Sequence, residues 1–186
     1  PRYKDGKSDP IDAYSAAEQA LARRATAKAK DTTGLVEALR MVKGPRDSAV
    51  KHRTCAYNQL RDLITTAPDT IRDQLLPLTT RQRLTKAAAM RPDPARITEP
   101  EHAARYALRA LARRITELDA EIDAADQHIA RLTRKACPRL LAMPQVGPQS
   151  AAQLMITAGQ NIDRMRTEAT FAKLCGVAPL PASSGK

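Results

Sequence analysis

Residues 108–132, which read LRALARRITELDAEIDAADQHIARL, decide the fold. Apolar residues recur through this stretch at alternating steps of three and four, which places them on one face of a helix. We call these positions the seam, and together they persist for roughly four heptads. A seam of this length predicts a long helix that packs against a partner helix. Its members are Leu108, Leu111, Ile115, Leu118, Ile122, Ala125, Ile129 and Leu132.

The partner of the seam helix is left open by the sequence. It is either the helix through Leu60 of the same chain, which would give an antiparallel hairpin, or the same helix of another subunit. The ends of the helix are better defined. Thr98 and Glu101 have the spacing of a capping box and predict its start, and Pro138 predicts its end.

The segments before the seam helix are also predicted to be helical. Asp9 and Pro10 supply an N-cap and a first-turn proline for a helix that runs to about residue 24. Helical spacing resumes at Leu35 and continues through Leu63. Gly44-Pro45 is expected to kink or break this helix, which would give a short helix followed by a long one.

Two shorter helices are predicted between the long ones. Pro68 and Pro77 bracket the first, which contains Ile71 and Leu75. Thr79 and Gln82 form a capping box for the second, which extends to Met90.

Composition favours the same fold class and indicates a partner. Aromatic residues make up 3% of the chain, so helix packing through Ala, Leu, Ile and Val is favoured over a β-sandwich, and we expect a mainly α protein. The net charge of +11 and a pI near 10 are typical of proteins that bind polyanions, nucleic acid first among them. A cationic surface without such a partner is the alternative.

The cysteines and the hydropathy pattern bear on location. Cys55, Cys137 and Cys175 are odd in number and far apart, so neither a disulfide framework nor a zinc site is predicted. No apolar run approaches the roughly 18 to 20 residues that span a bilayer, so we expect a cytoplasmic protein without a membrane partner.

Two carboxylates at the first predicted helix are candidate metal ligands. Asp9 and Asp12 lie three residues apart, which puts both on one helix face, and their hard oxygens would suit Mg²⁺. By spacing alone the simpler interpretation is that Asp9 caps the helix and that Asp12 favours the positive end of its dipole.

Two further segments are candidates for nucleic-acid binding. Residues 140–152 resemble a helix-hairpin-helix turn, in which Gly147 and Ser150 would let backbone N–H groups approach a phosphate, although Gln145 stands where that pattern has its first glycine. Lys51, Arg53 and Arg61 would form a basic face on the second helical segment. The alternatives are an ordinary turn, and a helix surface whose Arg46 and Arg53 lie over a partner helix.

Taken in chain order, four motifs resemble the insertion-sequence one-ten transposases, which are DEDD-type serine recombinases that work with a structured guide RNA. Each motif alone is weak, but their order and separation match nearly end to end. The motifs are residues 6–13 (GKSDPIDA), 36–41 (VEALRM), 144–148 (PQVGP) and 174–179 (LCGVAP) followed by Ser183-Ser184-Gly185.

The resemblance implies a division of the chain and a set of catalytic residues. Residues 1–34 would be the end of a RuvC-like, RNase H-like α/β domain, in which Asp9 and Asp12 are the last two Mg²⁺-binding carboxylates. Residues 35–137 would be a helical coiled-coil linker, and residues 138–186 the start of a C-terminal transposase domain. Its serine nucleophile would be Ser184, with Ser183 as the neighbouring alternative.

The implied function is DNA transposition by Mg²⁺-assisted serine strand exchange. The implied partners are DNA, a guide RNA, and further copies of the chain in a dimer or tetramer joined through the coiled coil. Because the first residue is Pro1 and the remaining acidic residues would lie before it, we expect the chain by itself to lack turnover. The alternative function is a non-catalytic coiled-coil module that binds nucleic acid, in which the two carboxylates only cap a helix.

Overall fold

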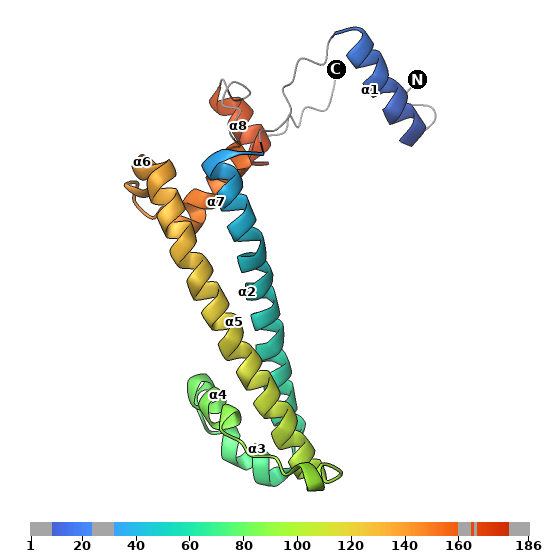
Figure 1. Cartoon of the computed structure of the whole chain (residues 1–186), viewed down its shortest axis with the longest axis vertical. Coiled ribbons are helices and arrows are strands. Elements are labelled where there is room, and N and C mark those ends of the chain that lie inside the picture. Colours follow the sequence, from blue (N-terminus) through green and yellow to red (C-terminus); the bar gives the residue numbers. More distant parts are fainter. Residues whose placement is uncertain (1–8, 24–31, 160–164, 166, 179–186) are drawn as a thin grey trace, which may run out of the picture. The chain divides into compact units, whose positions relative to one another are not determined.

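A computed structural model describes residues 9–23, 32–159, 165 and 167–178 of the chain. Within these ranges the regular structure is helical and contains no β-strand, which confirms the mainly α fold (Figure 1). The larger compact unit spans Thr32–Ala158. Outside it the described helices are α1 (Asp9–Leu21) and α8 (Glu168–Leu174). Among the described helices, none combines the length and apolar character needed to cross a bilayer.

Two long helices, α2 (Gly34–Thr66) and α5 (Pro100–Ala136), form the body of the larger unit (Figure 1). Two ion pairs fix their relative direction. Arg46 Nε donates to Asp126 Oδ1 at 2.8 Å, and Arg53 Nη1 donates to Asp119 Oδ1 at 2.8 Å. The arginines are one heptad apart, and so are the aspartates in the opposite order. The pair is therefore an antiparallel hairpin, and the seam's partner is a helix of the same chain.

The seam is buried along its whole length. Leu108, Ile115 and Ile129 are fully buried, Ile122 is 4% exposed, and the four intervening seam residues are partly buried. This alternation is what an apolar stripe packed on a single partner helix produces. Each fully buried side chain of this size contributes about 1.5 to 3 kcal/mol through removal from water, so the seam is a major source of stability.

One end of the hairpin is closed by the connection between its two helices. This connection contains α3 (Asp69–Leu75), α4 (Thr80–Ala88) and the short 3₁₀ turn η1 (Pro94–Arg96). The capping box predicted for α4 is confirmed, because Thr79 N donates to Gln82 Oε1 at 2.9 Å and Gln82 N donates to Thr79 Oγ1 at 3.4 Å. The buried residues of this end come from all four helices: Ala56, Leu60, Ile64, Ala67, Ile71, Leu75, Ala87, Ala104, Leu108, Ala112 and Ile115.

The prediction that Gly44-Pro45 divides the second helical segment is wrong. α2 is one continuous helix with Pro45 inside it. A proline in a helix interior costs about 3 kcal/mol, because it removes one backbone hydrogen bond and crowds the preceding turn. Here Leu39 and Ala49 are both buried on either side of Pro45, which itself is exposed. Packing on both sides of the proline therefore outweighs its local cost.

The predicted capping box at the start of α5 is also wrong. The helix begins at Pro100 with Glu99 at the N-cap, so Thr98 lies one residue too early to cap it. The Glu99 carboxylate instead accepts two hydrogen bonds from Arg96, at 2.7 and 2.6 Å. Glu101, the other member of the predicted box, accepts a hydrogen bond from Arg105 Nη2 at 2.5 Å.

Two short helices, α6 (Pro138–Leu141) and α7 (Pro148–Ala158), lie at the other end of the hairpin (Figure 1). There α7 packs against both long helices, in a second cluster built on the buried Leu39, Ile129 and Ala152. The larger compact unit therefore continues past residue 137 to the end of α7. The division of the chain at residues 34 and 137, and the assignment of residues 1–34 to an α/β domain, stay predictions.

Candidate nucleic-acid interface

The position of α7 on the hairpin is set by one polar junction and by small residues. Gln149 Nε2 donates to Asp126 Oδ1 at 2.6 Å, and the same oxygen accepts from Arg46 Nε at 2.8 Å. Asp126 therefore joins α2, α5 and α7. Ala151 and Ala152 are fully buried, which lets the α7 backbone come close to the long helices. The hydrogen bond that Arg46 donates to Asp126 raises the pKa of Arg46, although partial burial opposes this effect.

The turn between α6 and α7 projects its backbone outward. Met143, Gln145 and Gly147 are exposed, and no other group lies near the position where a Cβ of Gly147 would be. Gln145 has φ +66°, in the left-handed region that glycine adopts most easily. This is the position at which a helix-hairpin-helix pattern has its first glycine. A positive φ is therefore adopted at this position without a glycine, and the helix-hairpin-helix assignment stays a prediction.

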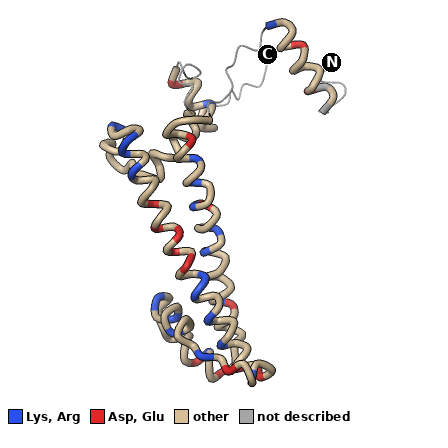
Figure 2. The backbone as a smooth tube through the Cα atoms, viewed as in Figure 1, with Lys and Arg blue, Asp and Glu red and all other residues tan. Residues whose placement is uncertain are grey.

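Four exposed cations surround the end of α5 and the start of α6. We call Arg131, Arg134, Lys135 and Arg139 the basic end. The sequence contains no Asp or Glu between Asp126 and Asp163, so the basic end has no acidic neighbour along the chain. Within the described ranges, no ion pair involves any of these four residues. Figure 2 shows Lys and Arg positions close together along the backbone at the α6 end of the hairpin.

The predicted basic face on α2 is not a continuous surface. Lys51 is exposed, but Arg53 forms an ion pair with Asp119 on α5. Arg61 is 66% exposed and has a long contact of 3.4 Å with its neighbour Asp62. The interpretation that Arg46 and Arg53 lie over a partner helix is therefore confirmed. Gly147 and Ser150 are exposed at the α7 end of the hairpin, whereas the three α2 residues follow the Arg46–Asp126 pair toward the α3 and α4 end (Figure 1).

The predicted catalytic residues are only partly described. Asp12 is exposed on α1. The side chain of Asp9, together with Ser183 and Ser184, lies outside the described part of the chain. Within that part, no three or more His, Cys, Asp or Glu side chains are grouped so that they could hold a metal ion. The catalytic and metal-binding roles of Asp9, Asp12 and Ser184 therefore stay predictions.

Comparison with protein families gives two matches, one toward each end of the chain. Residues 2–67, which contain α1 and α2, match the transposase model DEDD_Tnp_IS110. Residues 137–186, which contain α6, α7 and α8, match the model described as Transposase IS116/IS110/IS902 family. The chain belongs to the IS110 transposase family. No curated protein and no solved structure matches this transposase chain.

The basic end of this transposase chain is the surface that sequence reasoning missed. The predicted basic residues form one cluster on α2. The local sequence does not reveal that Arg53 has an acidic partner on α5. The signal for the basic end is an absence of acid over residues 127–162, together with four cations within nine positions of one another. Such a segment cannot be neutralised by its neighbours in the chain.

Proposed function

We propose that this chain acts within a DNA transposase. Its basic end binds DNA phosphates, and a serine is the nucleophile for strand exchange. The observation that carries the proposal is the pair of family matches, in chain order and on both sides of the helical hairpin. In this proposal residues 1–34 belong to a RuvC-like catalytic domain, residues 35–137 link it, and residues 138–186 open the C-terminal transposase domain.

The proposed reaction is a transesterification at a DNA phosphate. The Ser184 hydroxyl gives up its proton as its oxygen bonds to phosphorus, and the bond from phosphorus to one bridging sugar oxygen breaks. The departing sugar oxygen takes a proton and leaves as a hydroxyl. The covalent link keeps the energy of the broken phosphodiester for the joining step, in which a second strand's hydroxyl reverses the exchange.

Asp9 and Asp12 are the residues of this chain that would hold Mg²⁺. Their carboxylate oxygens suit a hard cation, and their spacing at the start of α1 puts both on one side of the helix. When bound, the ion would supply positive charge to stabilise the reacting phosphate oxygens. The two aspartates would therefore act by binding and orienting that charge, and further ligands would complete its coordination.

The basic end and the α6–α7 turn supply the proposed DNA contact. Exposed Arg and Lys side chains without acidic partners neutralise phosphates and release counterions, which gives affinity without base specificity. The exposed turn at Gly147 and Ser150 would add backbone N–H groups at the start of α7. Gln149 holds the start of α7 on the hairpin through Asp126. In this proposal the turn and the basic end contact the same DNA.

The proposed partners also include a structured guide RNA and further copies of the chain. Because α2 covers the seam of α5, a dimer or tetramer would assemble through the outer faces of the hairpin. The guide RNA is proposed from the family and from the net charge of +11.

The proposed role of Ser184 as nucleophile is tested by substitution in an active transposase that contains this sequence. Ser184→Ala should abolish strand cleavage and the covalent protein–DNA adduct, whereas the neighbouring Ser183→Ala should retain both. Asp9→Asn and Asp12→Asn should each reduce Mg²⁺-dependent recombination by at least about tenfold. Normal joining by Ser184→Ala would refute the proposed nucleophile and would favour the non-catalytic binding module.

DNA docking is tested by equilibrium binding of duplexes of different sequence to the 186-residue chain. Replacing Arg134, Lys135 and Arg139 by Ala should weaken all duplexes about equally and should reduce the salt slope by about 2 to 3. The control replaces Lys51, Arg113 and Arg114 by Ala. These residues are also exposed, and their replacement removes the same amount of positive charge. Equal losses from both triple variants would mean that only net charge matters and that the basic end is not a docking surface.

A further inference from the structure

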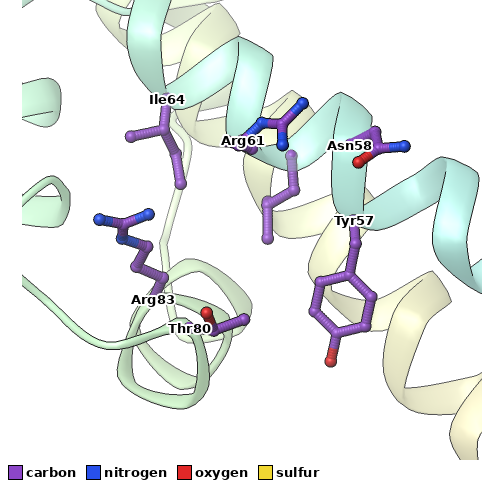
Figure 3. A pocket seen from close by; sticks show the side chains of 7 residues that line it. Tyr57, Asn58, Arg61, Ile64, Thr80 and Arg83 are labelled. Atoms are coloured by element: carbon purple, nitrogen blue, oxygen red, sulfur yellow. The ribbon is translucent and has the colours of Figure 1, made fainter.

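A groove of about 290 Å³ lies between α2 and α4 (Figure 3). It is at the end of the hairpin away from α7 (Figure 1). Leu60 and Ile64 of α2 supply an apolar floor, and the partly buried ring of Tyr57 lies beside it. Thr80 and Arg83 of α4 line the opposite side. The volume is at the lower limit of sites that hold small organic molecules, so a single planar group fits better than a larger ligand.

The polar groups at the groove are amide, hydroxyl and guanidinium, and none of the lining residues is acidic. Asn58 and Arg61 are exposed at its rim. Burial and the nearby Asp119 carboxylate raise the pKa of Tyr57, so its phenol remains neutral near pH 7. The groove thus combines a neutral aromatic ring with donors for an anion.

Arg83 has a structural role in the groove. Its Nε donates to the Leu75 carbonyl oxygen at 3.0 Å, and its Nη2 donates to the Leu76 carbonyl oxygen. These carbonyls belong to the end of α3, where a cation also favours the helix dipole. Arg83 therefore fixes α4 against α3 and keeps the groove open. Arg61 is 66% exposed and would exchange its long 3.4 Å contact with Asp62 for a contact with a ligand phosphate.

The α4 side of the groove is basic, whereas Asp62 and Asp119 lie near Arg61 and Tyr57 on the α2 side. Residues 74–92 contain Arg81, Arg83, Lys86 and Arg91 and no Asp or Glu. Figure 2 shows Lys and Arg along α4. This second acid-free segment is distinct from the basic end, because the two lie at different ends of the hairpin (Figure 1). A polyanion that reaches the groove would meet positive charge along α4.

We propose that this groove binds one unpaired nucleotide of a single-stranded nucleic acid. The base stacks on the Tyr57 ring above Leu60 and Ile64, and Arg61 contacts its phosphate. Aromatic rings take any base, so this contact favours single strands over sequence. A duplex is excluded because its bases are stacked inside and would have to be extruded. RNA and DNA share this chemistry, and the test includes both.

The test measures binding of labelled single-stranded RNA, single-stranded DNA and duplex DNA to the 186-residue chain. Tyr57→Leu removes the ring but keeps an apolar group against the core, and should weaken single-strand binding about tenfold without changing duplex binding. Tyr57→Phe keeps the ring and should bind normally. The matched control is Tyr106→Leu, because Tyr106 is an exposed α5 tyrosine that does not line the groove.

Arg61→Ala and Asn58→Ala test the site on exposed residues, so they keep the proposal testable even if Tyr57→Leu perturbs folding. Arg61→Ala should reduce the salt slope for single strands by about 0.7. Loss in only the RNA or only the DNA arm would identify the source of the nucleotide. The proposal is overturned if the groove variants leave single-strand binding unchanged, which is the result expected if the groove binds a protein segment instead. It is also overturned if these variants weaken duplex binding as much as single-strand binding. Failure of this proposal would not affect the proposed DNA docking at the basic end, because that docking is measured by duplex binding.

Discussion

At the scale of single residues, the two interhelical aspartates make a matched comparison. Asp119 accepts one interhelical hydrogen bond, from Arg53, whereas Asp126 accepts from Arg46 and also from Gln149 of α7. Asp119→Asn should lower the free energy of unfolding by less than about 1 kcal/mol, because the pair is partly exposed. Asp126→Asn should lower it by about 1 to 2 kcal/mol, because two charged contacts weaken.

Urea unfolding measures these two losses, and hydrogen exchange locates them. Faster amide exchange in α7 is expected for Asp126→Asn and not for Asp119→Asn. Unchanged α7 exchange in the Asp126 variant would show that α7 is held by its buried alanines alone.

Glu99 provides the pH-dependent prediction at the same scale. Its hydrogen bonds from Arg96 hold the pKa of this carboxyl below the ordinary glutamate value. A lowered folded-state pKa means that this contribution to stability is present above the ordinary glutamate pKa and is lost as the pH falls through the folded value. NMR titration should give a low pKa for Glu99, and Arg96→Gln should return it toward the ordinary value. An unshifted Glu99 in the parent chain would contradict the pairing.

The local sequence does not show which cationic side chains are free of ion pairs and could bind a nucleic acid. The sequence predicts that Arg53 binds nucleic acid because it lies with Lys51 and Arg61 in the basic second helical segment. Its partner Asp119 lies on the other long helix, and only the register of the hairpin brings the two together. Asp12 and the α7 turn can be named as candidates from the sequence because their patterns are short, whereas pairing across the hairpin requires the fold.

At the scale of helices, two threonines that looked equivalent in sequence should behave differently. Thr79 caps α4 in a complete capping box, whereas Thr98 precedes the Glu99 N-cap of α5. Thr79→Ala should lower stability by about 1 kcal/mol, and Thr98→Ala should change it little. Thermal or urea unfolding of both variants measures the difference. A larger loss from Thr98→Ala would mean that α5 starts where the sequence pattern placed it.

Local signals predicted most helices but failed where packing decides. The capping box of α4 and the short α3 depend on residues within one turn, and both were predicted correctly. Pro45 was expected to divide α2, because its cost is local and visible in sequence. The compensating burial of Leu39 and Ala49 depends on helices more than 60 positions away, as in the Leu39 and Ile129 cluster.

At the scale of the whole molecule, the seam could be predicted in full but its partner could not. Periodicity identifies which face of α5 is apolar, and that face is indeed buried. It carries no information about which helix covers that face, since α2 of the same chain and α5 of another copy offer similar apolar stripes. The choice rests on the α3–α4 connection, which lets α2 fold back, and on the two interhelical ion pairs.

This intramolecular hairpin predicts how the chain unfolds. Ile115 and Ile122 are 0% and 4% exposed in the seam, so replacing either by Ala should lower the free energy of unfolding by about 2 to 4 kcal/mol. Ile97→Ala, at a residue that is 44% exposed, is the control and should cost far less. Because α2 is attached to α5, the melting temperatures should not change over about a hundredfold range of protein concentration. If melting rises with concentration in the parent chain, and the seam variants remove that dependence, the partner of α5 in solution is a second copy and the hairpin is not the folded unit.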